Sequence, residues 1–516
     1  MKKPSTARLT LFAAFLTAQA AQGVPPAAVV REKVRAYRAA HEVEILRELA
    51  GLLATPNVAS DTENIRKNAD AAAALLSRRG VRTQLLEVPG APPIVYGELS
   101  SPGARRTVIF YAHYDGQPVD PAKWTGKPWQ PVLRDGRLEA GGHDVEWSAL
   151  KSPVNPEWLV YARSASDDKA PIVGLAAALD ALKAAKVPLS VNLKVFLEGE
   201  EEAGSPHLQS ILEKYRYLLK GDMWLLCDGP VHQSRRMQVF FGARGITGVE
   251  ITAYGATRRL HSGHYGNWSP NPIAELANLI AGMRDDRGNI LIKGFADDVR
   301  PLTEGERRAV ATAPDIGPAL RSELAIGRTE GAADERLEAA ILRPALNLRG
   351  FQGGDVGEKA TNSIPTEATV SIDFRLVPDQ TPERVRSRIE AHLRGLGYTL
   401  VSDVPDAAAR KATPRLLRVR WDAGSYPSGR TPLDLPVSRA VVRVTSESFG
   451  APIVELPTLG GSVPMYLFTD LLKTPVVGVP IANHDNNQHA SNENLRIQNL
   501  WDGIETYAAL LARLEW

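Results

Sequence analysis

Residues 197–205, LEGEEEAGS, join the end of an apolar strand to a dense run of acids. The preceding residues, VNLKVF, alternate in polarity and predict a buried β-strand that ends near Phe196. The carboxylates of this stretch are Glu198, Glu200, Glu201 and Glu202. Like charges packed this closely repel one another unless a cation lies among them. The run indicates either a solvated acidic turn or a metal site in which one carboxylate binds a cation and its neighbour transfers protons.

Other residues with the chemistry of metal ligands also follow predicted strands or precede a helix. They are His113 and Asp115 after the strand 107–111, Asp167 and Asp168 before a helix over 171–185, Asp228 at the end of DMWLLCDG, and His489 after TPVVGVP. Each one alone has an ordinary interpretation, as a surface histidine, a helix N-cap or a turn-forming acid. Their common position at strand ends favours a shared site.

The order of elements predicts how these residues meet. Strands alternate with helices before residue 246 and after residue 428, which predicts an α/β catalytic domain with a doubly wound, mostly parallel sheet. The carboxyl ends of parallel strands lie at one edge, and sites form beyond that edge. Two imidazoles with several carboxylates suit divalent ions, and the excess of carboxylates favours two ions, zinc before Mn²⁺ or Co²⁺.

Residues 246–428 predict a second domain inserted into the first, which comprises 21–245 and 429–516. The predicted order of elements in the insertion is β-α-β-β-α-β, the split βαβ or ferredoxin-like arrangement of an α+β domain. Within it, residues 288–345 are charged and weakly patterned, and the sequence assigns them no role.

Composition excludes some classes of partner. The chain has 516 residues, enough for two domains and a sizeable core. Hydrophobic residues make up 44% and charged residues 23%, which is typical of a globular protein. The net charge of +2 gives no reason to expect nucleic acid or an acidic membrane as a partner. Cys227 is the single cysteine, so the chain has no internal disulfide.

Residues 1–20 have the pattern of a cleaved secretory signal peptide. Basic residues precede an apolar stretch over 9–18, and Ala18-Gln19-Ala20 supplies small residues for cleavage after Ala20. The apolar stretch is too short for a permanent span, and no other stretch qualifies as transmembrane. We therefore expect an exported protein, periplasmic or secreted, without a stable membrane span.

Taken together, the motifs resemble those of a known family of dizinc metallopeptidases. This family includes carnosine dipeptidases, aminoacylases, acetylornithine deacetylases and glutamate carboxypeptidases. The matching motifs are AHYDGQPV, SASDDKAP, LEGEEEAGS, LHSGHYG, FRLVPDQTPE, LGGSVP and NQHASNEN. They occur in the family's order over residues 40–510, and the match is closest to the carnosine-dipeptidase-like branch. The insertion resembles the family's lid and dimerisation domain, which implies a homodimer.

The resemblance implies metal ligands at matching positions. His113 would bind one zinc ion and Glu202 the other, and Asp167 would bridge them. Asp228 would complete the first site and His489 the second. Asp115 would not bind metal; it would orient His113, because ligating imidazoles are usually held by a further hydrogen bond.

The resemblance also implies catalytic and substrate contacts. Glu201 would be the general base that takes a proton from the attacking water and later passes it to the leaving amine. His261, in the insertion, would stabilise the oxyanion after closure, and in the family this residue often comes from the partner subunit. Arg375 would hold a substrate carboxylate, with Asn362 and Ser462 as neighbouring contacts.

Two features depart from the family pattern. The bridging motif has lost glycines, since it reads Ala162-Arg163-Ser164 and then Asp167-Asp168-Lys169-Ala170, although no ligand is lost. Residues 139–158 form an insertion just before this motif and bring His143, Asp144 and Glu146 close to it in sequence. This insertion is either a loop over the active site that tunes substrate choice or a surface embellishment.

These observations predict a hydrolase of unblocked dipeptides or short peptides. An N-acyl-amino-acid amidohydrolase uses the same chemistry and presents the same amide beside a carboxylate, so it remains an alternative. A third hypothesis is an exported binding protein that has lost catalysis, but neither a ligand nor Glu201 is missing.

Overall fold

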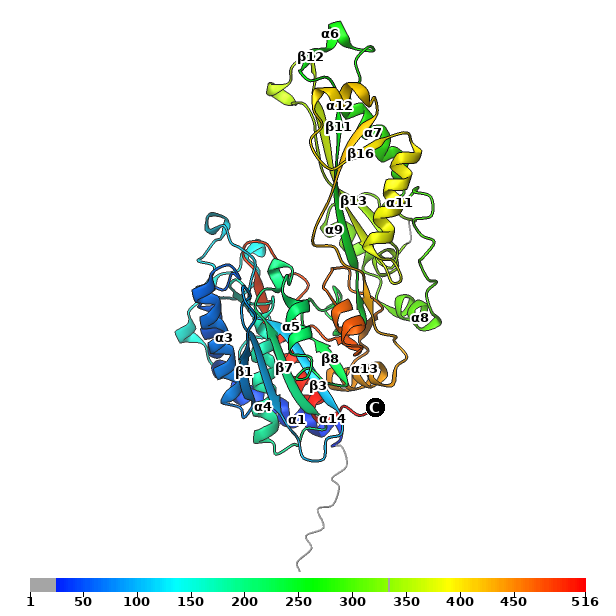
Figure 1. Cartoon of the computed structure of the whole chain (residues 1–516). Helices are drawn as coiled ribbons and strands as arrows, with labels where there is room; N and C mark the ends of the chain where they lie inside the picture. The colour runs from blue at the N-terminus through cyan, green and yellow to red at the C-terminus, as the bar shows by residue number, and fades with distance from the viewer. Residues whose placement is uncertain (1–24, 333–334) are drawn as a thin grey trace, which may run out of the picture.

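The computed structural model describes residues 25–332 and 335–516. The predicted signal peptide, residues 1–20, lies outside the described residues. Among the described residues, no helix is long and apolar enough to cross a membrane. Figure 1 shows an elongated molecule whose two parts each contain a β-sheet.

The larger part is built on an eight-stranded sheet. Its strands, in spatial order, are β1 (Arg82–Leu86), β2 (Ile94–Leu99), β7 (Asn192–Glu198), β3 (Thr107–His113), β8 (Met223–Leu226), β20 (Val476–Gly478), β9 (Gln238–Phe240) and β19 (Val454–Leu456). The central strands β7, β3, β8 and β20 run parallel, so their carboxyl ends share one edge. The outer pairs β1–β2 and β2–β7 are antiparallel.

Both faces of this sheet are covered by apolar side chains from helices. Along β3, Val108, Phe110 and Ala112 enter one buried cluster, whereas Ile109 and Tyr111 enter the cluster on the opposite face. The first face packs against α1 (Ala27–Ala40), α2 (Glu42–Leu53), α3 (Thr62–Ser77), α4 (Lys169–Ala184), α13 (Pro436–Phe449) and α14 (Ile497–Arg513). The second packs against α5 (Leu208–Lys214) and the π-helical turn Leu467–Leu471. The predicted doubly wound α/β class is confirmed.

The helices differ in detail from the sequence prediction. Apolar residues at helical spacing, from Val30 to Leu49, predict one helix over 26–53. The structure has two helices there, because the chain breaks at His41, whose ring Nδ1 lies 2.8 Å from the carbonyl oxygen of Tyr37. The sequence offers Ser60 or Asp61 as the N-cap of a helix over 61–79, and in α3 the cap is Asp61, whose side chain accepts from the Asn64 N–H. An amphipathic pattern predicts a last helix over 493–514, but this helix begins at Ile497, because residues 494–496 form strand β21.

The smaller part contains a five-stranded sheet with helices on one face. Its strands, in spatial order, are β13 (Ala345–Gln352), β15 (Glu367–Leu376), β11 (Gly245–Tyr254), β17 (Leu416–Trp421) and β16 (Thr399–Val401). Helices α7 (Pro272–Met283) and α11 (Pro382–Gly395) pack on it through residues such as Leu279 and Ile389. Apart from the short β16, this is the predicted β-α-β-β-α-β order. We keep the limits 246–428 of this unit as a proposal.

Two regions without a clear sequence pattern contain helices or strands in the structure. Residues 288–345 contain the short helices α8 (Glu304–Thr312), α9 (Gly317–Glu323) and α10 (Leu337–Ala340). The 139–158 insertion joins a four-stranded sheet in the order β21 (Asn494–Arg496), β6 (Leu159–Tyr161), β4 (Val132–Arg134) and β5 (Asp144–Val145). This small sheet ties the insertion to the segment just after His489.

Candidate metal centre

Ligand-type side chains converge at the carboxyl edge of the large sheet. His113 ends β3, Asp228 follows β8, Glu202 lies in the turn after β7, and Asp167 precedes α4. Their ligand atoms form two groups that share Asp167, namely His113–Asp167–Asp228 and Asp167–Glu202–His489, and within each group all atoms lie within 4.8 Å of one another. The geometry thus brings together the residues predicted to bind two metals.

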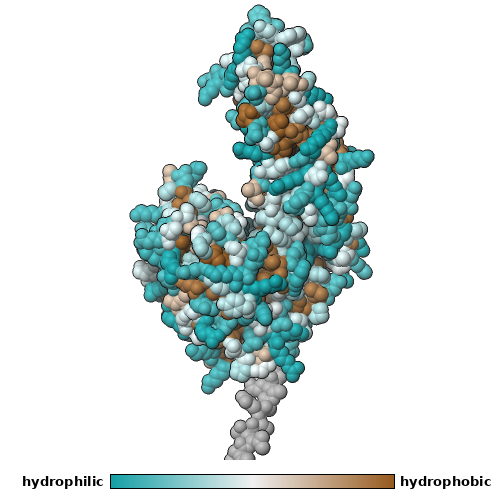
Figure 2. Space-filling view, in the orientation of Figure 1, coloured by the Kyte–Doolittle hydropathy of each residue, from teal (hydrophilic) through white to brown (hydrophobic). Residues whose placement is uncertain are grey.

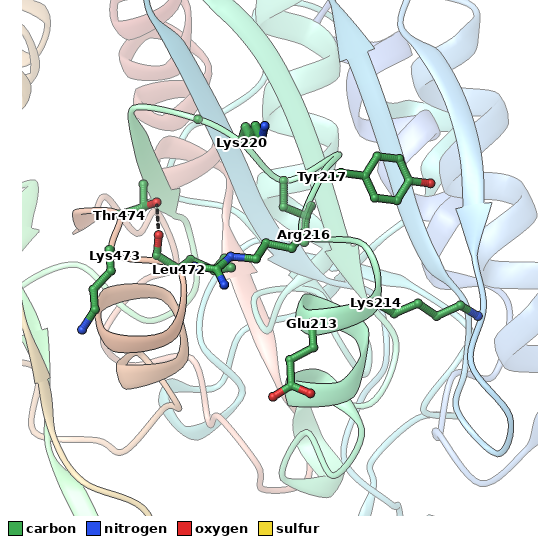
Figure 3. Close-up of a pocket in the computed structure, with 10 residues that line it drawn as sticks. Glu213, Lys214, Arg216, Tyr217, Lys220, Leu472, Lys473 and Thr474 are labelled. Carbon is green, nitrogen blue, oxygen red and sulfur yellow. Dashed lines mark hydrogen bonds between the residues drawn. The ribbon is translucent and has the colours of Figure 1, made fainter.

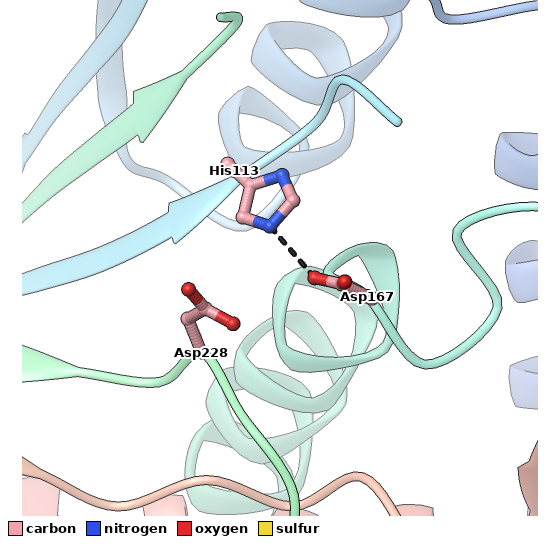
Figure 4. Close-up of side chains that lie close together, drawn as sticks. All are labelled: His113, Asp167 and Asp228. Carbon is pink, nitrogen blue, oxygen red and sulfur yellow. Dashed lines mark hydrogen bonds and ion pairs between the residues drawn. The ribbon is translucent and has the colours of Figure 1, made fainter. Parts of the chain in front are cut away.

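The contacts within the two groups radiate from Asp167. The Nε2 atom of His113 lies 2.9 Å from one carboxylate oxygen of Asp167. The Nε2 atom of His489 lies 3.2 Å from the other oxygen and 3.2 Å from Glu202. Figure 4 shows the His113 ring facing Asp167. The Asp228 carboxylate lies apart from this contact, and the three side chains surround a common space. A carboxylate that faces two ligand groups with its two oxygens is arranged to bridge two ions.

Asp115 is a buried support for two ligands. One of its oxygens lies 3.2 Å from Nδ1 of His113, on the side of the ring away from Asp167. The same carboxylate accepts hydrogen bonds from the backbone N–H groups of Glu201 and Glu202, at 3.2 and 3.0 Å. It therefore fixes the imidazole and the acidic turn relative to each other, as expected of a residue behind a metal ligand.

Glu493 is a support that the sequence interpretation missed. Its side chain is fully buried and accepts hydrogen bonds from the backbone N–H groups of Ser164, Ser166 and Asp167, at 2.8 to 3.0 Å. Arg163 balances its charge with a 2.9 Å ion pair. The Glu493 carboxylate thus fixes the conformation of the loop that carries Asp167. Glu493 is part of the motif NQHASNEN, and the presence of an acid in that motif was the only feature of the sequence that could have indicated its role.

Two amides hold the carboxylate oxygens. The Gln488 side chain donates to Asp167 at 2.9 Å, and Gln117 donates to Glu202 at 2.8 Å. Neither was predicted. Both lie beside predicted ligands in the motifs NQHASNEN and AHYDGQPV, and a polar neighbour is too common to indicate a role.

The electrostatics of the cluster favour bound cations. Burial, and then the charge of Asp167, raise the pKa of Asp228 to about 7. Burial also raises the pKa of Glu201 well above its usual range. Hydrogen bonds that the His489 ring donates to Asp167 and Glu202 raise the pKa of His489 to about 10. Crowded acids that hold protons in this way lose them to solvent when divalent cations bind. The donor set of imidazole nitrogens and carboxylate oxygens fits such ions.

The substrate residues predicted in the smaller part separate into two places. The Nη1 atom of Arg375 donates to Ser462 Oγ at 2.8 Å, and its Nε donates to Asp373 at 2.8 Å. His261 and Asn362 lie together instead, in the paired strands β12 (Leu260–His261) and β14 (Ser363–Ile364) and beside them. Figure 1 shows β12 at the far end of the smaller part, away from β3 and β7. One chain therefore does not bring His261 to the metal centre.

The 139–158 insertion does not add ligands to the centre. His143 is exposed and faces Asp135, whereas Asp144 pairs with Arg134. The contact with the site loop is made by Glu139, which accepts from Asn487 at 3.0 Å. The insertion thus braces the loop that carries His489, and its role in substrate choice stays a prediction.

A separate surface pocket of about 620 Å³ lies at the opposite edge of the large sheet (Figure 3). Its lining includes Lys220 and Gly221, which precede β8, and Lys473 and Thr474, which precede β20. The amino ends of parallel strands do not share an edge with their carboxyl ends, so this pocket is not part of the metal centre.

Comparisons with known proteins agree with this architecture. Residues 241–399 match the family described as the peptidase dimerisation domain, M20_dimer. The chain is 25% identical to the human Beta-Ala-His dipeptidase, over 95% of this chain and 94% of that protein. It is 27% identical to the Cys-Gly metallodipeptidase of Saccharomyces cerevisiae, over 81% of this chain and 82% of that protein.

Solved structures show the same fold. A metallo-carboxypeptidase of the M20 family from Sulfolobus solfataricus has a TM-score of 0.73 and 28% identity, covering 91% of this chain and 98% of that chain. Human carnosine dipeptidase 1 has a TM-score of 0.71 and 23% identity, covering 95% and 99%. The fold and site define a metallopeptidase with an inserted dimerisation domain. Over most of its length the chain is similar to peptidases of the M20 family, and residues 241–399 match the dimerisation domain of that family.

The comparisons contradict one prediction, that of export. The Cys-Gly metallodipeptidases of the two yeasts are cytosolic-type enzymes, and they match 81% and 82% of this chain. The expected exported location is corrected accordingly. The basic and apolar residues on which it rested lie outside the described part of the chain.

Proposed function

We propose that the protein is a dinuclear metallopeptidase that hydrolyses the amide bond of unblocked dipeptides or short peptides. The observation that carries the proposal is the pair of ligand groups sharing Asp167. The dipeptidases matched over most of the chain support this choice of substrate.

His113 and Asp228 would hold one ion and Glu202 and His489 the other, with Asp167 between them. Zinc is the first choice for this donor set, and Mn²⁺ or Co²⁺ are alternatives. When bound, the ions would polarise the scissile carbonyl and lower the pKa of the attacking water.

Glu201 is the proposed general base. It lies in the same turn as Glu202, and its backbone N–H is held by Asp115 at 3.2 Å, which fixes its position. Its carboxylate takes the proton of the attacking water and delivers it to the leaving amine nitrogen. Burial raises its pKa, which makes it a stronger base than an exposed glutamate.

Arg375 and Ser462 would hold the substrate carboxylate. The Arg375 side chain is 30% exposed and is oriented by Asp373, so part of its guanidinium fork remains free for a carboxylate. Asn362 would contact substrate together with His261 from the smaller part.

A second candidate is an N-acyl-amino-acid amidohydrolase. A succinyl-diaminopimelate desuccinylase from Acidovorax ebreus is 25% identical over 70% of this chain and 68% of that protein. A catalytically inactive binding protein is a lesser alternative, because all the proposed ligands and Glu201 are present.

We further propose a homodimer in which His261 serves the partner's metal centre. The dimerisation domain supports a dimer. Strand β13 lies at the edge of its sheet and exposes Leu348 and Phe351, at 42% and 44%. Figure 2 shows apolar surface on the smaller part and a hollow between the two parts. An exposed apolar edge strand is suited to pairing with a second copy.

The test is depletion of a mixed substrate pool by the zinc-reconstituted protein, followed by mass spectrometry. The pool contains unblocked dipeptides and N-acetyl amino acids. We expect loss of the free dipeptides. Loss of only the acetylated members would assign an amidohydrolase, and loss of neither by protein shown to hold its metals would refute both enzymatic proposals.

A further inference from the structure

Arg244 is a buried guanidinium without an acidic partner among the described residues. It lies between β10 (Gly242–Ala243) and β11, and the residue is 7% exposed. Its Nη2 donates to the carbonyl oxygen of Arg343 at 2.8 Å, whereas Nε has no hydrogen-bond partner. None of the ion pairs in the described chain includes Arg244. Buried charges are normally paired, so this cation calls for an explanation.

Contacts of the backbone place Arg244 beside Arg375. The Arg244 N–H donates to the carbonyl oxygen of Gly461 at 3.2 Å, and Arg375 donates to the next residue, Ser462, at 2.8 Å. The side chain of Arg244 contacts the carbonyl oxygen of Arg343, which lies just before β13 in the chain. The first residue of β13, Ala345, pairs with Arg375. Burial, and then the charge of Arg375, lower the pKa of Arg244 to about 10, as two neighbouring cations require.

The acid nearest to these cations is already engaged. Asp373 accepts from Arg375 Nε at 2.8 Å and from the Asn347 amide at 3.4 Å. Only Arg375 is paired with this carboxylate, so the second guanidinium, that of Arg244, has no carboxylate of its own. A substrate with a single carboxylate on Arg375 would still leave Arg244 without an anion.

We propose that Arg244 binds a second substrate carboxylate, that of an acidic C-terminal side chain, while Arg375 and Ser462 bind the main-chain carboxylate. The substrate class is then dipeptides ending in glutamate or aspartate. This inference rests on the proposed dipeptidase function. It makes Arg244 a specificity-determining residue, because a buried guanidinium binds an acidic side chain more tightly than the neutral isostere of that side chain.

The experiment compares kcat/KM for Ala-Glu and Ala-Gln, which differ in one charge and little in shape. We expect the wild-type metal-loaded enzyme to prefer Ala-Glu by about 10- to 100-fold, the range of a charge-assisted hydrogen bond. In Arg244→Met the ratio should fall towards one, mainly through a higher KM for Ala-Glu. Arg244→Lys, which keeps the charge, should retain part of the preference.

Taking the ratio within each variant cancels any general loss of activity. Arg420→Met is the matched control, because Arg420 is an exposed arginine of the same sheet, on β17 and away from the edge strand β13, that pairs with Glu250 at 2.8 Å. Its ratio should equal that of the wild type. A wild-type ratio near one, or a preference that survives in Arg244→Met, would overturn the inference while leaving the dipeptidase proposal intact. Failure of the wild type to cleave either peptide or any other dipeptide would refute the proposed function instead.

Discussion

Glu201 and Glu202 are adjacent acids with different proposed tasks. Glu202 contacts His489 at 3.2 Å and Gln117 at 2.8 Å, so it belongs to a ligand group, whereas Glu201 does not. We predict that Glu201→Gln binds metal as the wild type does but lowers kcat by about 10²- to 10⁴-fold, the usual contribution of a general base. Metal content by elemental analysis and single-substrate kinetics measure the two effects.

The exposed Glu213→Gln on α5, at the pocket of the opposite sheet edge, is the control for loss of one negative charge away from the metal centre, and it should change neither quantity. Near-normal turnover of Glu201→Gln would remove Glu201 from the base role. Loss of metal from this variant would instead make Glu201 a ligand.

Glu493 tests whether a residue that touches no ion can set metal affinity. We predict that Glu493→Gln weakens metal binding by about 10- to 100-fold, because the N–H groups of Ser166 and Asp167 lose a charged acceptor and Arg163 loses its partner. Competition with a chelator measures the affinity. Glu505→Gln, which removes a buried acid far from the site, is the control and should bind metal normally. Equal affinity in Glu493→Gln and the wild type would contradict this role.

The proposed ligands and the support Asp115 could be predicted from the sequence, whereas the supports Glu493, Gln488 and Gln117 could not. His113, Glu202 and Asp228 follow strands whose apolar patterns are strong, so their meeting at one edge follows from the sheet. Glu493 acts on Asp167 across 326 residues of chain, and no local pattern encodes that contact.

At the scale of elements, the packing of α14 on α1 leaves one acid poorly paired. Arg35 on α1 makes a bidentate contact with Glu505, at 3.1 and 2.7 Å. Asp502, one turn earlier on α14, keeps only the Gln498 amide at 2.7 Å. Burial therefore raises the pKa of Asp502 to about 6. Charging this carboxylate in the folded protein costs free energy.

We predict that Asp502→Asn stabilises the protein at neutral pH. The folded pKa exceeds the unfolded value of 3.8, so the folded state binds the proton more tightly. The penalty is absent below about pH 4, grows up to about pH 6 and is complete above it. The difference in unfolding free energy between variant and wild type should thus rise by about 1–2 kcal/mol between pH 4 and pH 7.5.

Thermal and denaturant unfolding across this range measure the difference. Asp70→Asn removes an exposed acid of α3 and should give a difference that changes little with pH. A flat profile for Asp502→Asn would contradict the raised pKa.

Helices and strands with a strong periodicity of apolar residues were predicted well, and each exception has an identifiable cause. Apolar positions at helical spacing predict a helix over 436–449, and α13 has these limits. The break at His41 was missed because apolar spacing continues through it, and β21 was missed because its pairing partner, β6, is distant in sequence. The helices of residues 288–345 are short and charged, so periodicity could not reveal them.

At the scale of the molecule, the two parts hold halves of one proposed site. Asp167 and its partners lie on the large sheet, whereas His261 lies at the far end of the smaller part (Figure 1). The His261 ring is exposed, accepts from the Gly263 N–H at 3.1 Å and stacks near His264 at 4.5 Å. An exposed imidazole far from its own centre can act on another chain's centre if the dimer places it there.

This arrangement predicts complementation between two inactive variants. His261→Ala and Glu201→Gln should each lack activity as homodimers. In a mixed dimer, the chain with His261→Ala keeps its own Glu201 and receives His261 from its partner, so one centre is complete. Random mixing should restore roughly a quarter of wild-type activity, because half of the dimers are mixed and each has one intact centre. Co-expression with two affinity tags isolates the mixed dimer for assay. If the mixed dimer is as inactive as the parents, His261 acts within its own chain, and the closure that brings it to Asp167 must then occur inside one subunit.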